Sequence, residues 1–336
     1  MNVIKETTGI QLDGFDIERI IIRNKNNIKL SVLSVGCAIE GFYVPDKNGQ
    51  IENIVLSYDD VKTYLENPDY FGSIVGRTAG RISKGRFKLE GQTYELDKND
   101  QDYNLHSGRA GLQKKNWKAE IVEEGSAGGV VFTHESPDGD GGFPGNVKLC
   151  VKYILDEDNT LHMTYEGVTD APTILNMTNH TYFNLSGDVN RQVFNHRLWI
   201  NSEQFAPIQE NGCPVGLLAG VDGTAFDFRE EKTIGQDIGA NETQIMRGGG
   251  FDHPFLLEKS DTPQVKLSHP ETGRQLLVWT DQDAVVVYTA NHLDHKAICL
   301  ETQNLPDHVN RKGFPSQAVT PEKPYKAQTK IHVGHV

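Results

Sequence analysis

Short stretches in which apolar and polar residues alternate recur along most of the chain, and they constrain its fold more than any other feature. Successive side chains of a β-strand point to opposite faces, so a period of two gathers the apolar residues on one face. Such stretches lie at residues 17–24, 28–36, 85–97, 148–156, 160–167, 265–269, 274–281 and 284–291. They are rich in Val, Ile, Tyr, Phe and Leu, and Asn, Asp and Gly separate them. The pattern predicts antiparallel β-structure.

Two segments give more detailed local expectations. In "FKLEGQTYEL", residues 87–96, Gly91 marks a hairpin turn between two short strands. The apolar residues of these strands can share one face: Phe87, Leu89, Tyr94 and Leu96. Helical spacing is clear in "SYDDVKTYLENP", residues 57–68, where we expect Ser57 to be the N-cap and Pro68 to end the helix. "KTIGQDI", residues 232–238, is a weaker helical candidate.

Nothing in the sequence divides the chain into parts. The Gly-rich segments 138–145 and 247–254 are short, and there is no internal repeat or low-complexity linker. A chain of 336 residues is long for one domain, but β-sandwiches often form a single unit of more than about 200 residues. We therefore predict a single domain over residues 1–336, with an all-β, antiparallel sandwich fold.

Charge and hydropathy limit the classes of partner. There are 33 Lys and Arg against 46 Asp and Glu, a net charge of −13, and no basic run with interleaved aromatic residues. Residues 1–10 lack the apolar core of a signal peptide, and the longest apolar run, residues 284–288, is too short to cross a bilayer. We expect a cytoplasmic protein, monomeric or homodimeric, with no nucleic-acid or membrane partner.

The cysteine and histidine spacings favour neither disulfides nor a metal site. The four cysteines are far apart in the sequence: Cys37, Cys150, Cys213 and Cys299. We expect buried, reduced thiols. The tightest group of metal-ligand types is His292, His295 and Cys299 in "NHLDHKAIC", which matches neither HExxH nor a zinc-finger spacing. A metal site there is a minor alternative.

Two predicted strands carry chemically reactive residues on a polar face. In "TNHTYFNLSG", residues 178–187, alternation puts His180 between Thr178 and Tyr182 on the face away from the core. In "AICLETQN", residues 297–304, Glu301 and Gln303 share a face. Alone, each would be read as a structural histidine or a solvated glutamate. Together, an imidazole and a carboxylate on the walls of one cleft can serve as general acid and base.

Four further residues could bind a polar substrate: Arg77, Arg81, His106 and Asp252. Arginine forks and carboxylates bind hydroxyl groups well, and loops on a rigid β-scaffold commonly carry such groups. The alternative for each is a surface salt bridge or a turn. The P-loop pattern GxxxxGK[ST] and the GxSxG elbow are both absent from the sequence, so nucleotide binding and serine hydrolysis have no support.

Several motifs in a fixed order resemble the aldose 1-epimerases, and the resemblance covers nearly the whole chain. The motifs are "PDKNG", "YFGSIVGRTAGRISKGRFKLEGQTYELDKN", "NLHSG", "DGDGGFPGN", "NHTYFNLSG", "GFDHPFLL" and "LETQNLPDHVN" followed by "FP". The resemblance implies a β-supersandwich with very little helix, no metal or organic cofactor, and interconversion of the α and β anomers of free aldohexoses such as galactose and glucose. It also makes His180 the general acid and Glu301 the general base.

The same resemblance assigns sugar contacts to Arg81, His106 and Asp252, and the flanking Gly80 and Tyr182 are expected to touch the substrate. Phe251 and Phe314 are the aromatic residues that we expect to pack against the less polar face of the sugar.

The chain departs from the family pattern at three positions. Many members have Asn at Gly80, Gly at Ser107 and Gln at Val286, and the last change leaves the preferred sugar open. Two alternatives also stay open. One is an epimerase of phosphorylated hexoses that uses Arg77, Lys84 or Arg86 to bind phosphate, and the other is a sugar-binding module without turnover.

Overall fold

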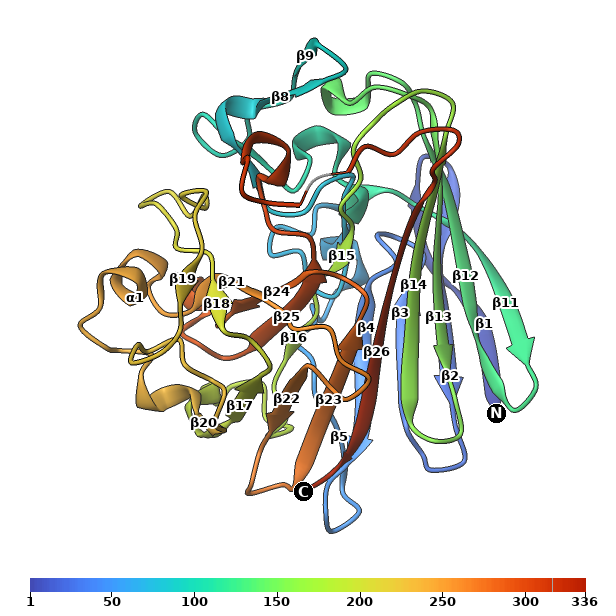
Figure 1. Ribbon diagram of the computed structural model, residues 1–336. Coiled ribbons are helices and arrows are strands. Elements are labelled where there is room, and N and C mark those ends of the chain that lie inside the picture. Colours follow the sequence, from blue (N-terminus) through green and yellow to red (C-terminus); the bar gives the residue numbers. More distant parts are fainter. Residues whose placement is uncertain (316) are drawn as a thin grey trace.

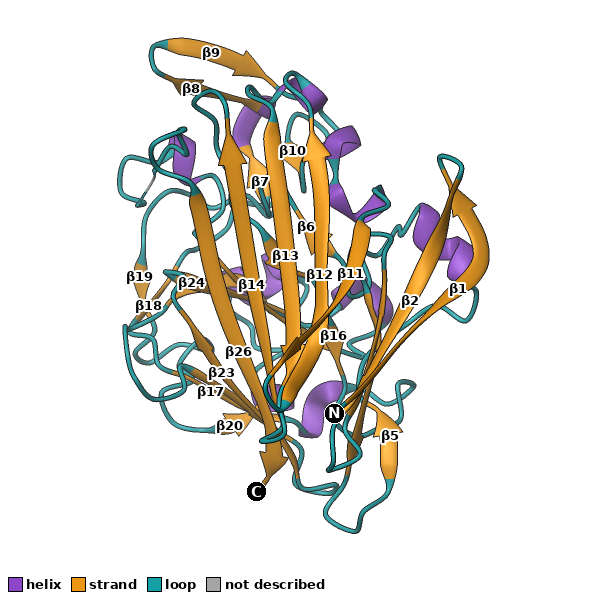
Figure 2. Cartoon of the chain, turned by 90° about the vertical axis from the view of Figure 1, so that its right-hand side faces the viewer, coloured by secondary structure: helices purple, strands orange, loops and turns teal. Residues whose placement is uncertain are grey.

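Most of the regular structure in the computed structural model, which describes residues 1–315 and 317–336, belongs to three antiparallel sheets (Figure 1). The largest has nine strands in the order β11-β12-β13-β14-β26-β23-β22-β17-β20. Their bounds are Lys118–Glu124 (β11), Ala127–Ser136 (β12), Val147–Leu155 (β13), Thr160–Thr169 (β14), Tyr325–His335 (β26), Arg274–Thr280 (β23), Val265–Ser268 (β22), Arg197–Ile200 (β17) and Lys232–Thr233 (β20). The longest of these strands run side by side in Figure 2.

The second sheet has six strands in the order β16-β25-β24-β21-β18-β19, and the third has five, in the order β1 to β5. The six are Tyr182–Phe183 (β16), Ile298–Gln303 (β25), Ala284–Tyr288 (β24), Asp252–Leu256 (β21), Gln204–Phe205 (β18) and Ala219–Gly220 (β19). The five are Asn2–Leu12 (β1), Phe15–Arg23 (β2), Lys29–Leu33 (β3), Ile39–Pro45 (β4) and Ile51–Asn53 (β5). Three strand pairs complete the set: Ile74–Val75 (β6) with Thr178–Asn179 (β15), Arg81–Ile82 (β7) with Asn104–Leu105 (β10), and Arg86–Leu89 (β8) with Gln92–Glu95 (β9).

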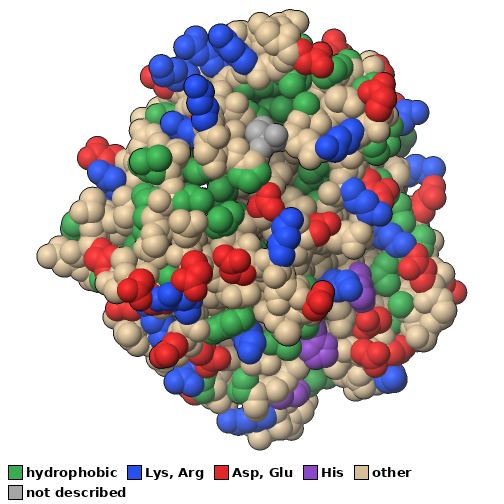
Figure 3. Space-filling view, viewed as in Figure 1, with side chains coloured by type: hydrophobic (Ala, Val, Ile, Leu, Met, Phe, Trp, Pro, Cys, Tyr) green, Lys and Arg blue, Asp and Glu red, His purple; other side chains and the backbone are tan. Residues whose placement is uncertain are grey.

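Helices are short and peripheral. The α-helix α1 covers Thr243–Gly248, and 3₁₀ turns lie at Val61–Leu65, Ser83–Gly85, Gly108–Ala110, Leu112–Lys114, Asp140–Gly142, Val193–Asn195, Ile234–Gln236, Asn291–Leu293 and His308–Asn310. None of the helices in the described ranges has the length and hydropathy of a membrane span. On the face shown in Figure 3, acidic and basic side chains are mixed over most of the surface. The absence of nucleic-acid and membrane partners stays a prediction.

One apolar core joins the three large sheets. It contains Ile20 and Phe42 from the five-stranded sheet, Phe132 and Leu276 from the nine-stranded sheet, and Phe255 from the six-stranded sheet, all without solvent exposure. Burial of each such side chain contributes about 1.5–3 kcal/mol relative to exposure. This core fixes the six-stranded sheet against the other two. The expected all-β supersandwich with little helix is confirmed.

The hairpin prediction is correct and the helix prediction is partly wrong. β8 and β9 pair around a turn at Glu90 and Gly91, both with positive φ, and Phe87 lies opposite Tyr94 with the rings stacked. The expected helix at residues 57–68 is a single 3₁₀ helix, Val61–Leu65, and its N-cap is Asp60 rather than Ser57. The Asp60 carboxylate accepts a hydrogen bond from the Lys62 N–H at 2.9 Å, which starts the helix three residues later than predicted.

The segment around His180 is not the single strand that alternation predicts. It forms two short strands, β15 and β16, which pair in different sheets, and the chain changes direction at residues 180–181. The Asn179 amide donates to the Gly72 carbonyl, and the Thr181 hydroxyl donates to the Asn179 amide oxygen. Side chains that bond locally in this way compete with a continuous ladder. His180 therefore lies in the connection between two sheets.

Candidate active site

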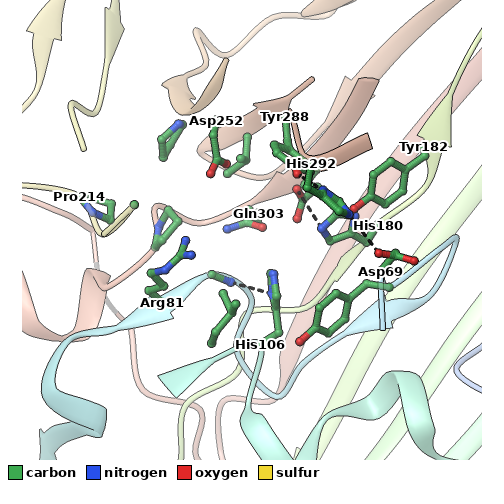
Figure 4. A pocket seen from close by; sticks show the side chains of 18 of the residues that line it. Asp69, Arg81, His106, His180, Tyr182, Pro214, Asp252, Tyr288, His292 and Gln303 are labelled. Atoms are coloured by element: carbon green, nitrogen blue, oxygen red, sulfur yellow. Dashed lines mark hydrogen bonds and ion pairs between the residues drawn. The ribbon is translucent and has the colours of Figure 1, made fainter. Parts of the chain in front are cut away.

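A cavity of about 200 Å³ lies at the six-stranded sheet, and seven of the residues that the sequence assigned to the site line it (Figure 4). Those residues are Gly80, Arg81, His106, His180, Tyr182, Asp252 and Glu301. Further lining residues that the sequence did not assign as site residues are Pro68, Asp69, Tyr70, Leu105, Gly212, Pro214, Pro254, Val286, Tyr288, His292, Gln303 and Pro306. The cavity therefore collects polar groups from both halves of the chain.

Three neighbouring strands form one wall of the cavity. On β25, Glu301 and Gln303 point to the same side because they are two residues apart, as the sequence predicts. The adjacent strand β24 places Val286 opposite Glu301. On β21, Asp252 lies opposite Tyr288, the last residue of β24. The pleat of a rigid sheet thus holds two carboxylates, an amide and a phenol at fixed spacing.

His180 and Glu301 meet at the wall of this cavity. The His180 Nε2 atom lies 3.6 Å from Glu301 Oε1, and both side chains are almost fully buried. The imidazole stacks between the rings of Tyr182 and Tyr70, at centroid distances of 5.0 and 5.8 Å. On its other edge, Nδ1 contacts the Cys299 thiol at 3.5 Å. These contacts fix the plane of the imidazole and aim Nε2 at the carboxyl group.

Burial favours the uncharged forms of both partners. It lowers the pKa of His180 to about 4, and it raises the pKa of Glu301 well above its ordinary value, an effect that the Asp252 carboxylate increases. Burial therefore opposes both the imidazolium of His180 and the carboxylate of Glu301, and it favours a shared proton on Glu301 over one on His180. As general acid His180 must hold a proton and as general base Glu301 must lack one, so the expected roles need the proton on the other partner.

Gly80 and the pairing of β7 with β10 position Arg81 and His106. Leu105 pairs with Arg81, and the Gly80 N–H donates to His106 Nδ1 at 3.2 Å. Since Nδ1 accepts, the neutral imidazole carries its proton on Nε2. Burial lowers the pKa of His106 well below its ordinary value, and the neighbouring His180 and Arg81 lower it further. Arg81 donates from Nε to Asp100 Oδ2 at 2.7 Å, so its guanidinium is oriented at the cavity wall.

The conformation of Gly80 and the carboxylate of Asp252, which is unpaired within the described part of the chain, indicate ligand binding rather than a role in core packing. Gly80 has φ of +74°, and a Cβ atom there would lie 2.7 Å from the Pro306 ring, so any side chain would require rearrangement. No described residue donates a hydrogen bond to the Asp252 carboxylate, and burial raises the pKa of Asp252 to about 6. An acceptor that lacks a partner at a cavity wall is available to a bound hydroxyl group.

Comparisons with known proteins agree with this geometry. The family model described as "Aldose 1-epimerase" matches residues 18–332. The chain is 35% identical to galactose mutarotase from Rattus norvegicus, with 94% of each chain covered, and 35% identical to aldose 1-epimerase from Haemophilus influenzae, with 92% of each covered. A solved structure of galactose 1-epimerase from Lactobacillus acidophilus superposes with a TM-score of 0.90, at 30% identity and 99% coverage of both chains.

The chain belongs to the aldose 1-epimerase family. It is therefore an isomerase that acts on carbohydrates and interconverts aldose anomers.

Two sequence-based assignments for this aldose 1-epimerase are wrong. Phe251 and Phe314 do not line the cavity; both are buried in apolar clusters. The aromatic side chains that do line it are Tyr70, Tyr182 and Tyr288. Aromatic residues next to a motif can equally belong to the core, and the sequence offers no signal that separates the two cases.

Arg77, the fourth candidate for substrate binding, is structural. Its guanidinium is fully buried and donates to the Ser136 hydroxyl and to four carbonyls, those of Ser136, Pro137, Pro144 and Gly145, at 2.8–3.0 Å. Burial lowers the pKa of Arg77 to about 10. Lys84 and Arg86 do not line the cavity either, so none of the three cations named for a phosphorylated substrate faces it.

The residues of the alternative metal site separate in the fold. His292 contacts Asp69, His295 contacts the Thr289 carbonyl, and Cys299 contacts His180. Within residues 1–315 and 317–336 no three His, Cys, Asp or Glu side chains form a group that could hold a metal ion.

Proposed function

We propose that this aldose 1-epimerase acts on free aldohexoses such as galactose and glucose, with His180 as general acid and Glu301 as general base. The observation that carries the proposal is the contact of 3.6 Å between His180 Nε2 and Glu301 Oε1 at the wall of a cavity of about 200 Å³. Mutarotation requires an acid at the ring oxygen and a base at the anomeric hydroxyl, and both oxygens are bonded to C1. Two opposed groups in a small cavity can reach both.

The proposed reaction moves one proton onto the sugar and one off it. Glu301 accepts the proton of the anomeric hydroxyl while His180 donates a proton to the ring oxygen, and the bond between C1 and the ring oxygen breaks. Rotation about C1–C2 exposes the other face of the aldehyde. The hydroxyl that formed from the ring oxygen then attacks C1, while His180 takes its proton back from that hydroxyl and Glu301 returns a proton to the carbonyl oxygen. No proton is gained or lost over the cycle.

The location of the proton that burial favours is compatible with these roles. The pair holds one proton whether it resides on Glu301 or on His180, so substrate binding has only to move it between two atoms that are 3.6 Å apart. The state with the proton on Glu301 is also the state of the pair after the ring opens. Burial that favours this state stabilises the open-chain intermediate relative to the closed sugar.

Arg81, His106 and Asp252 are proposed as the sugar contacts, together with Gly80 and Tyr182. In Figure 4, Arg81 and His106 lie on one side of the cavity and Asp252 on the other. Arg81 and the His106 Nε2–H are donors, whereas Asp252 is an acceptor. A polyhydroxylated ring, whose hydroxyls both donate and accept, fits between them.

The substrate preference is proposed as galactose or glucose. The relatives named galactose mutarotase cover nine-tenths of the chain or more at 35–36% identity, which supports an aldohexose. Val286 puts an apolar side chain directly opposite Glu301, where many family members have a polar one. The rates with disaccharides and other aldoses, measured beside those with galactose and glucose, test this preference.

Glu301→Gln tests the proposal, because the amide keeps the size of the side chain and removes its basicity. We expect kcat, measured by polarimetry of freshly dissolved α-galactose and α-glucose, to fall by about 10²- to 10⁴-fold. Galactose affinity, measured by calorimetry, should change little. The matched control is Glu166→Gln, which alters an exposed glutamate in the middle of strand β14. A binding module would show no turnover in either protein, and a kcat within about threefold of the parent would exclude Glu301 as the base.

A cytoplasmic location is also part of the proposal. All four cysteines are free thiols and three are buried, as in proteins of reducing compartments. The single domain over residues 1–336 stays a prediction, supported by one apolar cluster that extends from Ile20 to Val333. A monomer or homodimer stays a prediction as well.

A further inference from the structure

A hydrogen-bonded chain of three side chains lines the cavity beside the proposed acid and base. The Tyr288 hydroxyl lies 2.5 Å from His292 Nδ1, and His292 Nε2 lies 3.0 Å from Asp69 Oδ1. Tyr288 ends β24, His292 lies in the 3₁₀ helix Asn291–Leu293, and Asp69 lies in the loop before β6. All three line the cavity, and Figure 4 shows the contacts that join them. The mechanism proposed above uses none of these residues.

Asp69, at the outer end of this hydrogen-bonded chain, determines which atoms of the chain donate and which accept. Tyr58 donates from its hydroxyl to Asp69 Oδ2 at 2.9 Å, and burial raises the pKa of Tyr58, so this phenol keeps its proton. An Asp69 carboxylate can only accept. While the His292 imidazole is neutral, its one proton is on Nε2 and is donated to Oδ1, and Nδ1 is the acceptor.

The direction of the hydrogen bond between Tyr288 and His292 follows from the tautomer of His292. Because His292 Nδ1 accepts, the one proton of the Tyr288 hydroxyl is directed to it. Burial raises the pKa of Tyr288, and the nearby Asp252 carboxylate raises it further, so the phenol is neutral. With its proton committed to His292, the Tyr288 oxygen can only accept further hydrogen bonds.

The position of Tyr288 in the sheet indicates which hydroxyl of the sugar can contact it. It lies opposite Asp252 in the β21–β24 pair, whereas Glu301, the proposed acceptor for the anomeric hydroxyl, lies opposite Val286. Tyr288 and Asp252 therefore form an acceptor wall that faces the donors Arg81 and His106 across the cavity. A hydroxyl that meets this wall must donate.

We propose that Tyr288 accepts a hydrogen bond from a non-anomeric hydroxyl of the sugar, and that Asp69 and His292 are positioning residues that hold Tyr288 in this accepting orientation. The inference rests on the proposed function, since it concerns the same cavity and the same sugar. The inference adds Tyr288 as a substrate contact and specifies that its oxygen accepts the hydrogen bond.

Asp69→Asn reverses the polarity of the chain without removing a hydrogen bond. Tyr58 would donate to the amide oxygen of the new side chain, and the amide N–H would donate to His292 Nε2. The imidazole would then carry its proton on Nδ1 and donate to Tyr288, which frees the phenolic proton to point into the cavity. We expect KM to rise by about three- to tenfold, the effect of one lost hydrogen bond, with a smaller change in kcat and an unchanged melting temperature.

Tyr288→Phe removes the acceptor and should raise KM to a similar extent. The double variant Asp69→Asn/Tyr288→Phe should be no worse than Tyr288→Phe alone, because Asp69 acts only through Tyr288. The matched control is Asp156→Asn, which alters an Asp–His pair of similar exposure, Asp156 with His162 at 2.8 Å, that lies outside the cavity. It should leave KM unchanged.

A panel of 2-, 3-, 4- and 6-deoxy derivatives of the preferred hexose identifies the hydroxyl. One of them should show the same KM with parent and Asp69→Asn, while the others keep the difference. An Asp69→Asn variant with parental KM, additive effects in the double variant, or an equal KM change for every deoxy sugar would each overturn the inference. These outcomes require an active parent, whereas an inactive parent would overturn the proposed function itself.

Discussion

Asp252→Asn should make the protein more stable at neutral pH and less active, and the stability change should depend on pH. The pKa of Asp252 is raised by burial from 3.8 to about 6 in the folded protein. A raised pKa stabilises the fold below the unfolded value, and this stabilisation is lost as pH rises through the folded value. Relative to the asparagine variant, the ionisable side chain costs about 1 kcal/mol at pH 4.5 and about 3 kcal/mol at pH 7.5. These are upper values because the Asp252 side chain is partly exposed at the cavity wall.

The measurement is urea unfolding of parent and variant at pH 4.5 and pH 7.5. The difference in unfolding free energy should grow by up to about 2 kcal/mol between these pH values in favour of the variant. The value of kcat/KM should fall by about 10- to 150-fold at pH 7.5, the effect of a lost hydrogen bond to a charged group. A variant that is less stable at pH 7.5, by an amount that does not change with pH, would show that Asp252 supports the fold and would refute the reasoning.

The remaining predictions concern protons, metal and a buried cation. The kcat/KM profile should be bell-shaped, because it falls when the His180–Glu301 pair gains a second proton near the pKa of about 4 of His180, or loses its last proton. His180→Asn should lower the profile and remove its alkaline limb, and survival of that limb would contradict the role of His180. Dialysis against a strong chelator should leave the rate unchanged, and a loss restored by zinc or manganese would contradict this. Arg77→Lys should lower the free energy of unfolding by about 2 kcal/mol or more in urea titrations, because carbonyls that accept from the guanidinium lose their donors, while the folded protein keeps its kcat.

Alternation predicted several of the longer strands, but it missed β1, β12 and β26, which have 11, 10 and 11 residues. β2, β13, β14 and β23 lie where the pattern placed them. Strands of two residues, such as β6 and β15, are too short to show a period, and α1 has six residues and the same limitation. The pattern failed at residues 178–185 because Asn179 and Thr181 bond locally, and a single sequence does not show which of two local patterns prevails.

The site was predictable where its residues lie on one strand or in one motif. Glu301 and Gln303 share a face by simple alternation, and His180 was found through its position on a polar face and the family motif. The chain of Tyr288, His292 and Asp69 was missed because Asp69 lies far from the other two in sequence and meets them only in the fold. His292 was noticed as a metal-ligand type, but its partner could not be inferred.

The place of His180 between two sheets has a consequence for the newly made polypeptide. Glu301 is synthesised long after His180, and its strand β25 pairs with the short strand β16 that follows the histidine. At about 5–20 residues per second, several seconds separate the two residues at the ribosome. An emerging chain that contains every other sugar contact still lacks its base. Catalytic competence should therefore appear abruptly only after Glu301 has been added, and nascent chains stalled before residue 301 should be inert.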